Sequence, residues 1–582
     1  MPTLNWIGKG AVEMHHKEVP FRLLEPVSEL SFGDEGSGNL IVQGDNLLAL
    51  KALLPRYASK VKCIYIDPPY NTGQDDRGGN GVRTGWVYND NVDSPEIREW
   101  LGRVVGAEAE DLCRHDKWLC MMYPRLRLLH SFLRDDGVIF ASIDDIEMAS
   151  LRFLFDEIFG VHNRIGVVVW KNATDNNPTR IASEHEYIIC YAKDKRKLPS
   201  EWKSPNLEVK EKLLAVGEEF VLQYPDQSRR QAAYTRWYRE NKSQLWPFED
   251  YKFIDSGGVY TGMRAVHNPG KEGYRYDVLH DVTNLPCQQP LMGYRFPEET
   301  MQRLINEGRI IFGADETKLV ELKVYAKDYR AKLSSFFELD GRIGTNEIKA
   351  IFPEDKRPFD FPKPTELIEE LISFTTSGDD IVLDSFGGSG TTANAVLKLN
   401  KADGGTRRFV LVEMKESIAK RITSERIRRI MSGYKSKKEM VKGFGGGFDF
   451  YKLSEEPLFQ ANGAIRPDVD YIQLAEFVWF METGTGLDKC RFKDRAPDSP
   501  HIGTYKGRAV FLLYNGILND KSEMGGNVLN SRMVRYLSEL LPNHDGPKVI
   551  YGARTRFDKS KMVKLGITFH QLPYELAIKT WF

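Results

Sequence analysis

The sequence predicts an α/β protein with a doubly wound, Rossmann-like sheet, an inserted α+β domain and a small C-terminal α/β domain. Strand and helix patterns alternate through residues 1–195, stop in 196–350 and resume in 351–442. Such alternation is typical of a parallel sheet covered by helices. Because loops at the rim of a sheet tolerate insertions, we expect one sheet built from two distant pieces of chain.

Apolar periodicity predicts the elements of the first piece. The expected strands are 61–66, 137–143, 165–170 and 187–192, and the expected helices are 45–57, 116–134 and 145–159. Asp45 stands where the first helix begins, and aspartate is a favoured residue for capping a helix N-terminus.

The second piece resumes the same rhythm. Its expected elements are helix 366–376, strand 380–384, helix 391–399, strand 408–413 and helix 416–431. The glycine-rich stretch 443–448 predicts a linker. Beyond it, 450–582 has strands of its own, such as 509–514 and 548–552, and predicts a separate domain that contacts a second copy or another partner.

The composition limits the classes of protein to consider. A chain of 582 residues is long enough for about three or four domains. Its net charge of −1 does not by itself indicate a nucleic-acid partner. The six cysteines include no C-x-x-C pair, which disfavours a disulfide framework or zinc site and fits a reducing cytosol. No signal peptide or apolar membrane span is evident, so we expect a soluble cytoplasmic protein.

A glycine loop follows the expected strand 380–384. Gly388, Gly390 and Ala393 fit the G-x-G-x-x-A pattern, and Glu413 ends the next expected strand. Glycines let the backbone approach a ligand closely, and an acid at this spacing accepts hydrogen bonds from ribose hydroxyls. The loop therefore predicts a nucleoside site. It lacks the G-K-[S/T] of a triphosphate loop, and leaves both NAD and S-adenosylmethionine open.

The tetrapeptide Asp67-Pro68-Pro69-Tyr70 ends the expected strand 61–66. The Asp67 carboxylate and the Pro68 carbonyl can accept hydrogen bonds from both N–H groups of an aryl amine such as adenine N6, which favours a tetrahedral nitrogen. The prolines stiffen the turn and offer no competing N–H. Tyr70 offers a ring on which a flipped-out base can stack. This corner favours methyl transfer from S-adenosylmethionine, which requires no metal.

These motifs resemble β-class DNA amino-methyltransferases, and in particular the Mod subunits of type III restriction–modification systems. The similarity covers at least 38–195 and 340–430, with the Asp-Pro-Pro-Tyr motif before the glycine loop, the permuted order of that class. The matching stretches are N-L-I-V-Q-G-D-N-L-L-A-L (39–50), C-I-Y-I-D-P-P-Y-N-T-G (63–73), W-V-Y-N-D (86–90), G-V-I-F-A-S-I-D-D-I-E (137–147), S-E-H-E-Y-I (183–188) and F-D-F-P-K-P-T-E-L-I (359–368).

The resemblance implies S-adenosylmethionine as cofactor, adenine N6 in double-stranded DNA as target, and 196–350 as a target-recognition domain. The implied cofactor-binding residues are Asp45, Asn46, Asp67, Phe359, Lys363, Pro364, Thr365, Asp384, Phe386, Gly388, Ser389, Gly390, Thr391, Thr392 and Glu413. The chain departs from the family pattern at Ser385 and Gly387, where we expect altered loop packing without loss of binding. The resemblance also implies a homodimer, a separate restriction subunit and a prokaryotic, nucleoid-associated location.

Basic and aromatic residues gather in the insert, the composition expected of a surface that neutralises phosphates and reads base edges. The candidate DNA-binding residues are Tyr70, Asn71, Thr72, Arg229, Arg230, Arg236, Arg264 and Arg275.

Other functions remain open at this stage. Cytosine-N4 DNA methylation, or methylation of RNA, would use the same corner. A catalytically silent DNA-recognition subunit would keep the fold, but the intact Asp-Pro-Pro-Tyr motif argues against it. A nicotinamide oxidoreductase shares the glycine loop and has no use for that motif.

Overall fold

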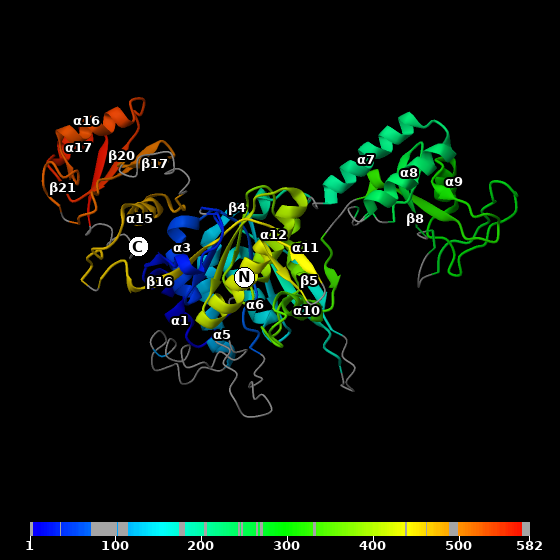
Figure 1. Ribbon diagram of the computed structural model, residues 1–582, viewed down its shortest axis with the longest axis horizontal. Helices are drawn as coiled ribbons and strands as arrows, with labels where there is room; N and C mark the ends of the chain where they lie inside the picture. Colours follow the sequence, from blue (N-terminus) through cyan, green and yellow to red (C-terminus); the bar gives the residue numbers. More distant parts are fainter. Residues whose placement is uncertain are drawn as a thin grey trace. The chain divides into compact units, whose positions relative to one another are not determined.

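The computed structural model describes residues 4–34, 36–71, 102, 114–173, 181–202, 206–242, 245, 248, 250–263, 266–267, 272–329, 333–436, 439–460, 462–487, 499–518 and 520–572 (Figure 1). The chain divides into two compact units. The larger combines Met1–Ser200 with Ser334–Phe582, and the smaller is Glu201–Leu333. The smaller unit lies inside the expected insert 196–350, whose first residues, 196–200, and last residues, 334–350, belong to the larger unit.

A ten-stranded sheet forms the centre of the larger unit. In spatial order its strands are β1 (Arg22–Pro26), β16 (Asp449–Pro457), β2 (Leu40–Gln43), β13 (Arg408–Glu413), β12 (Ile381–Asp384), β3 (Val61–Ile66), β4 (Leu133–Ile143), β6 (His185–Ala192), β5 (Arg164–Lys171) and β11 (Phe336–Glu338). The strands from β16 to β4 run parallel to one another. The two pieces of chain therefore interleave in one sheet, as the sequence predicts.

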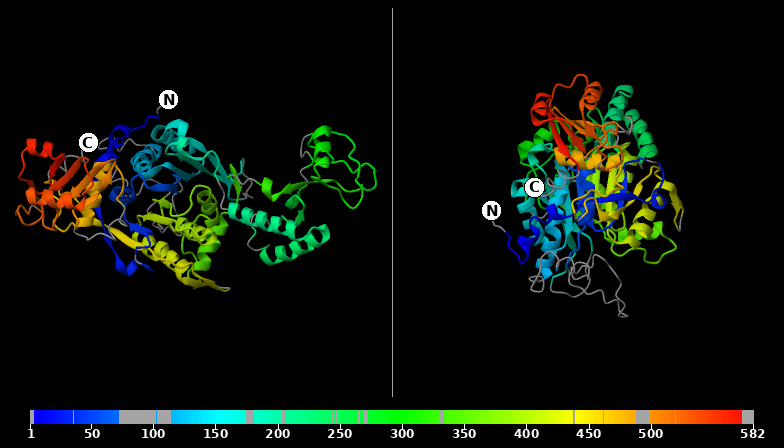
Figure 2. Two further views of the ribbon diagram at one scale, coloured as in Figure 1. Left: turned by 90° about the horizontal axis from the view of Figure 1, so that it is seen from above. Right: turned by 90° about the vertical axis from the view of Figure 1, so that its left-hand side faces the viewer.

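Helices cover both faces of this sheet (Figure 2). The first piece contributes α1 (Lys9–Val12), α2 (His15–Glu18), α3 (Asn46–Tyr57), α5 (Arg114–Phe132) and α6 (Met148–Phe155). The second contributes α10 (Arg342–Ile351), α11 (Thr365–Ser373), α12 (Thr391–Asp403), α13 (Glu416–Ile418) and α14 (Ser424–Ser432). Alternate strand residues point to opposite faces, so Ile64 and Ile66 of β3 join the core beneath α3 and α5.

The sheet is not parallel throughout. β6 runs antiparallel to both β4 and β5. A parallel neighbour needs a crossover of a dozen or more residues, usually with a helix. The sequence shows no helical period between 170 and 187, so β5 and β6 return on themselves as an antiparallel pair.

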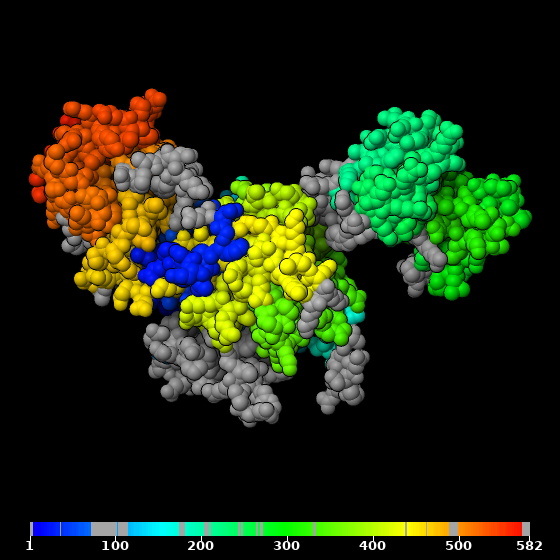
Figure 3. Space-filling model, in the orientation of Figure 1, coloured from blue at the N-terminus to red at the C-terminus, as the bar shows by residue number. Residues whose placement is uncertain are grey.

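The expected domain boundary at 450 falls inside a strand of the main sheet. β16 pairs with β2 in parallel and with β1 antiparallel. The N-terminal segment, blue in Figure 3, lies on the surface beside the yellow-orange segment that holds β16. The glycine stretch 443–448 thus leads into the sheet and not out of it.

The C-terminal part has its own four-stranded sheet, in the order β17 (His501–Tyr505), β18 (Arg508–Leu512), β20 (Lys548–Gly552) and β22 (Ile567–Gln571). Its helices are α15 (Tyr471–Thr483), α16 (Ser531–Leu540) and α17 (Lys559–Lys564), and β19 (Val528–Leu529) forms a short pair with β21 (Arg554–Thr555). Another short pair, β14 (Gly433–Lys435) with β15 (Met440–Lys442), precedes β16 in the chain. Within the described residues, no helix combines the length and apolar character needed to cross a membrane.

The smaller unit is α+β. It holds α7 (Asn206–Gln223), α8 (Gln227–Asn241) and α9 (Glu298–Asn306), with a sheet ordered β7 (Phe253–Asp255), β8 (Gly258–Met263), β10 (Glu321–Tyr325) and β9 (Ile310–Ile311). The helices α7 and α8 lie side by side (Figure 2). Tyr234 and Phe248 are fully buried in its core, so several aromatics of the insert stabilise the fold and are unavailable to a ligand.

Candidate active site

The two motifs meet at one edge of the sheet. β3 and β12 are neighbours in parallel, with Cys63 opposite Val382 and Ile64 opposite Leu383. Both strands therefore end at the same edge, where Asp67 and Asp384 lie. The charge of Asp67 is among the groups that raise the pKa of Asp384, which places the two corners within electrostatic reach. Ligands of doubly wound sheets bind at this edge.

The Asp-Pro-Pro-Tyr corner is fixed by hydrogen bonds. The Tyr70 hydroxyl oxygen lies within hydrogen-bonding distance of Asp67 Oδ1, at 2.9 Å. The Pro69 carbonyl accepts from the Trp118 indole at 2.7 Å. Asn71 adopts a φ of 62°, a left-handed conformation that asparagine tolerates, and its amide donates to the buried Glu147. The turn is thus anchored on both sides before any ligand binds.

Lys363 and Glu186 complete this corner. The Lys363 ammonium lies 3.0 Å from Asp67 Oδ2 and 3.4 Å from Glu186 Oε2. It also lies 4.8 Å from the Tyr70 ring centroid. Burial alone would lower the pKa of Lys363, but the carboxylates of Asp67 and Glu186 raise it above its ordinary value. Lys363, one of the implied cofactor-binding residues, therefore also compensates the charge of two carboxylates.

The glycine loop takes the conformation that its residues permit. Gly388 has a φ of +47° and Gly390 a φ of +79°, both left-handed. Gly390 caps α12, and the Gly388 N–H donates to Glu413 Oε2 at 2.9 Å. A Cβ on Gly388 would lie 3.4 Å from Cζ of Phe359. The sequence motif thus brings the loop, Glu413 and Phe359 together.

Two carboxyl groups beneath the loop have raised pKa values. Burial raises the pKa of Asp384 to about 7, although hydrogen bonds from the Thr392 hydroxyl and the Phe386 N–H oppose the shift. Burial also raises the pKa of Glu413 to about 7, against hydrogen bonds from the N–H groups of Lys415 and Gly388. Perturbed acids of this kind cluster at functional sites.

Asp384 is expected to make protein stability fall as pH rises. Its folded pKa of about 7 lies above its usual 3.8, so between these values the folded state binds more protons than the unfolded state. The free energy of unfolding should therefore drop between about pH 4 and pH 7, by about 4 kcal/mol for this group. Asp384→Asn should remove this dependence of stability on pH. At pH 8 the variant should therefore have a higher free energy of unfolding than the wild type, measured by urea unfolding.

Asp379→Asn provides the matched control, because Asp379 is an exposed aspartate just before β12. This variant should keep the wild-type dependence on pH. Identical slopes of stability against pH for the wild type and Asp384→Asn would contradict the assignment.

Arg426, which sequence reasoning did not select, holds the glycine loop from behind. This fully buried residue of α14 donates through Nη1 to the Ser389 and Thr391 hydroxyls, at 2.9 and 3.1 Å. Its Nη2 donates to Thr365 Oγ1 at 3.2 Å and lies 3.6 Å from Glu347. One guanidinium therefore joins the loop to two helices. The burial of Arg426 cannot be recognised from the run R-I-R-R (426–429) alone.

The remaining predicted cofactor residues line or support the same corner. Asp45 caps α3 through the N–H groups of Leu47 and Leu48. Asn46 is fully buried, and its amide lies 3.4 Å from the Ser385 carbonyl at the glycine loop. Pro364 stands at the N-terminus of α11, and the Lys363 carbonyl accepts from Thr391 at 3.3 Å. Thr365, Ser389, Thr391 and Thr392 thus have structural partners.

Apart from Tyr70, which lies in the corner described above, the candidate DNA-binding residues divide into three groups: exposed residues, residues outside the described ones, and buried residues. Arg229, Arg236 and Arg275 are exposed. Thr72 and Arg264 lie outside the described residues. Arg230 is a correction, because it is buried in the smaller unit and its guanidinium donates to the Tyr224 and Pro225 carbonyls.

Asn71 is likewise fully buried, so its side chain supports the turn and does not present a DNA-facing surface.

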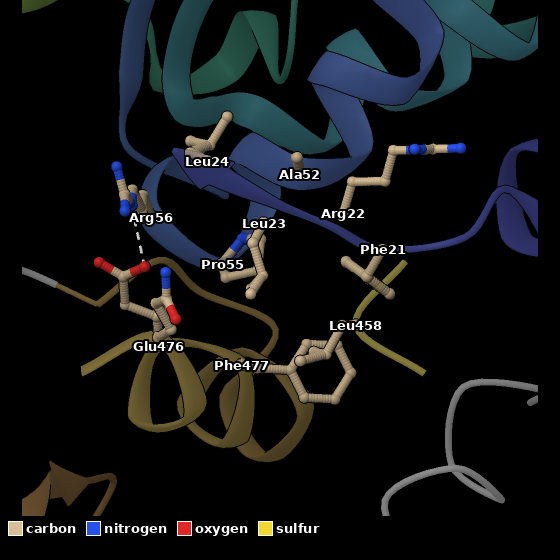
Figure 4. A pocket seen from close by; sticks show the side chains of 11 residues that line it. Phe21, Arg22, Leu23, Leu24, Ala52, Pro55, Arg56, Leu458, Glu476 and Phe477 are labelled. Atoms are coloured by element: carbon tan, nitrogen blue, oxygen red, sulfur yellow. Dashed lines mark hydrogen bonds and ion pairs between the residues drawn. The ribbon is translucent and has the colours of Figure 1, made fainter. Parts of the chain in front are cut away.

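A separate hollow lies between β1, α3 and α15 (Figure 4). It is lined by Phe21, Arg22, Leu23, Leu24, Ala52, Pro55, Arg56, Leu458, Gln473, Glu476 and Phe477. Arg56 at the end of α3 pairs with Glu476 of α15 at 2.9 Å. Asp45 begins α3 at the edge that carries the glycine loop, whereas this hollow lies at the other end of the helix. It is not part of the candidate site.

The similarities to known proteins agree with this geometry. The chain is 48% identical over 427 residues to the Mod subunit of the type III restriction-modification enzyme EcoP15I of Escherichia coli, covering 71% of this chain and 64% of that protein. It is 30% identical over 432 residues to the StyLTI Mod subunit of Salmonella typhimurium, covering 72% and 59%. It therefore spans about three fifths of the length of these type III relatives.

A shorter relative is covered more completely. The type II methyltransferase M.KpnI of Klebsiella pneumoniae is 30% identical over 411 residues, which cover 68% of this chain and 85% of that protein. The family model described as DNA methylase matches residues 61–425, which include the Asp-Pro-Pro-Tyr corner, the insert and the glycine loop. The chain therefore belongs to the DNA methylase family.

Proposed function

We propose that this protein is a site-specific DNA methyltransferase that transfers a methyl group from S-adenosylmethionine to N6 of a flipped-out adenine. The observation that carries the proposal is the pairing of β3 with β12. It brings the acceptor groups of Asp67-Pro68-Pro69-Tyr70 and the glycine loop to one edge of the sheet.

The glycine loop and its acids fit a positively charged nucleoside cofactor. Each oxygen of Glu413 accepts one backbone N–H, which leaves further lone pairs for ribose hydroxyls. The hydroxyl of Ser385 is buried and has no hydrogen-bond partner among the described residues. Glu413, Asp384 and Phe359 would hold the cofactor, which when bound supplies an electrophilic methyl group.

The corner would prepare the adenine amino group for attack. The Asp67 carboxylate and the Pro68 carbonyl would accept hydrogen bonds from its two N–H groups. These bonds favour a tetrahedral nitrogen, whose lone pair is no longer delocalised into the ring. The lone pair would then form the new N–C bond with the methyl group that a bound cofactor would supply, and the Asp67 carboxylate would accept the proton that the nitrogen loses. Tyr70 supports the base from one face.

The smaller unit is proposed to recognise DNA. Exposed Arg229 and Arg236 lie on the same helix, α8, where they can contact phosphates or base edges. By analogy with the type III Mod relatives, we further propose a homodimer that works with a separate restriction subunit in the bacterial cytoplasm.

Nucleoside analysis tests the proposed function. The purified chain is incubated with S-adenosylmethionine carrying a labelled methyl group and with genomic DNA, and the DNA is digested to nucleosides for mass spectrometry. Labelled N6-methyl-2′-deoxyadenosine is the expected product. Labelled N4-methyl-2′-deoxycytidine would establish the alternative target base, and DNA without label would favour a silent recognition subunit.

Tyr70→Ala is expected to weaken the complex with a flipped base. Loss of the stacking ring should cost about 1–3 kcal/mol of binding free energy. Binding is measured with duplex DNA that carries 2-aminopurine at the target position, whose fluorescence rises when the base leaves the stack. Tyr70→Phe keeps the ring and should retain the signal, whereas equal signals from Tyr70→Ala and the wild type would contradict the stacking role.

A further inference from the structure

The acceptor corner contains a second carboxylate, Glu186, to which the motif analysis assigned no role. Glu186 lies on β6 opposite Trp170 of β5. Its Oε1 accepts from the Asn172 amide at 2.7 Å, which fixes the orientation of the carboxylate. Its Oε2 points to the Tyr70 hydroxyl at 2.8 Å and to the Lys363 ammonium at 3.4 Å. Glu186 is thus held with one oxygen anchored and the other facing the site.

Tyr70 has one hydroxyl proton and two carboxylate neighbours. Its oxygen lies 2.9 Å from Asp67 Oδ1 and 2.8 Å from Glu186 Oε2. One O–H donates a strong, linear hydrogen bond to only one of these acceptors at a time. Whenever the proton points at Asp67, it occupies a lone pair there. Whenever it points at Glu186, Asp67 Oδ1 is free to accept another donor.

Lys363 also leaves Asp67 Oδ1 free. Its ammonium approaches the other oxygen of Asp67, Oδ2, at 3.0 Å. Asp67 Oδ1 is therefore the carboxylate oxygen for which an incoming amino group and the Tyr70 hydroxyl compete. A charged acceptor attracts a hydroxyl proton more strongly than a neutral one. The Lys363 ammonium lies closer to Asp67 than to Glu186 and compensates its charge more fully, so a charged Glu186 is the better acceptor for the Tyr70 proton.

We propose that Glu186 is a positioning residue that draws the Tyr70 hydroxyl away from Asp67 and so frees Asp67 Oδ1 to accept an N–H of the target amine. This role rests on the proposed methyl transfer and deepens it. Glu186 contacts neither the transferred methyl group nor the target nitrogen, and acts through the orientation of Tyr70.

A double-mutant cycle between Glu186→Gln and Tyr70→Phe tests the role. In the wild-type background, Glu186→Gln should lower kcat about tenfold, because its neutral amide competes less well for the Tyr70 proton. In the Tyr70→Phe background no hydroxyl proton remains to occupy Asp67, so the same change should lower kcat less than twofold. The KM for S-adenosylmethionine should stay within about twofold in all four proteins.

Two further variants complete the experiment. Glu338→Gln is the matched control. Glu338 lies on β11, where its carboxylate pairs with Lys171 of β5 at 2.7 Å, and its replacement should leave kcat unchanged. Asn172→Ala releases the anchored oxygen of Glu186 and should lower kcat in the same direction, an effect that Tyr70→Phe again cancels. It provides the test if Glu186→Gln does not fold.

The outcomes separate the two proposals. An active wild type with equal losses from Glu186→Gln in both backgrounds, or with no loss in either, would overturn the role of Glu186 alone. A folded wild type that methylates no base would overturn the proposed function, and the role of Glu186 with it.

Discussion

Asp67→Ala is expected to lower kcat for methyl transfer by about 10³-fold. The substitution removes the carboxylate that accepts an amino N–H as the nitrogen becomes tetrahedral, an interaction made chiefly in the transition state. Cofactor affinity should change by less than about threefold, since Glu413 and the glycine loop lie on the neighbouring strands β13 and β12. Single-turnover rates and cofactor binding by calorimetry measure the two effects separately.

Asp67→Asn is the matched companion of this experiment. It keeps the shape of the side chain and one oxygen but removes the charge that Lys363 compensates. Its rate should fall between those of Asp67→Ala and the wild type. A rate for Asp67→Ala near that of the wild type would rule out the acceptor role.

Arg426→Ala should have the largest effect on stability. The substitution leaves a cavity and removes the donors that serve Ser389, Thr391 and Thr365. Loss of one partner from such a buried network costs about 3–5 kcal/mol of unfolding free energy. The glycine loop also loses its anchor, so we expect cofactor affinity to fall about tenfold. Urea unfolding and calorimetry check the two effects.

Arg428→Ala controls for the loss of an arginine from the same helix. The Arg428 side chain is more than half exposed, at 56%. Among the described residues it pairs only with Glu425, three positions earlier on the helix. Its replacement should change stability by less than about 0.5 kcal/mol. If Arg426→Ala were as stable as Arg428→Ala, Arg426 would have no role in holding the loop.

The strands and helices nearest the site could be predicted from the sequence because their local signals agree. The predicted strand 61–66 has the bounds of β3, and the predicted strand 408–413 those of β13. Asp45 caps its helix as expected, because aspartate accepts the free N–H groups of a first turn. The predicted single sheet built from two pieces of chain is confirmed by the pairing of β3 with β12, which brings the two motifs together.

What the sequence did not predict depends on contacts between distant residues. Glu186 and Lys363 become neighbours only when β6 and the segment before α11 are in place. Arg426 has the same local pattern as the exposed Arg428, and only packing distinguishes the two. β16 follows a glycine-rich stretch that reads as a linker, and its membership of the sheet is decided by strands more than 400 residues earlier in the chain.

The interleaved sheet has a consequence for biosynthesis. β3 leaves the ribosome about 300 residues before its neighbour β12. At about 5–20 residues per second, its unpaired edge stays without that neighbour for tens of seconds. During that time the smaller unit, whose contacts are local to 201–333, can fold by itself. The nascent protein can therefore complete its smaller unit before the ten-stranded sheet closes, and any factor that shields a bare strand edge would act in that interval.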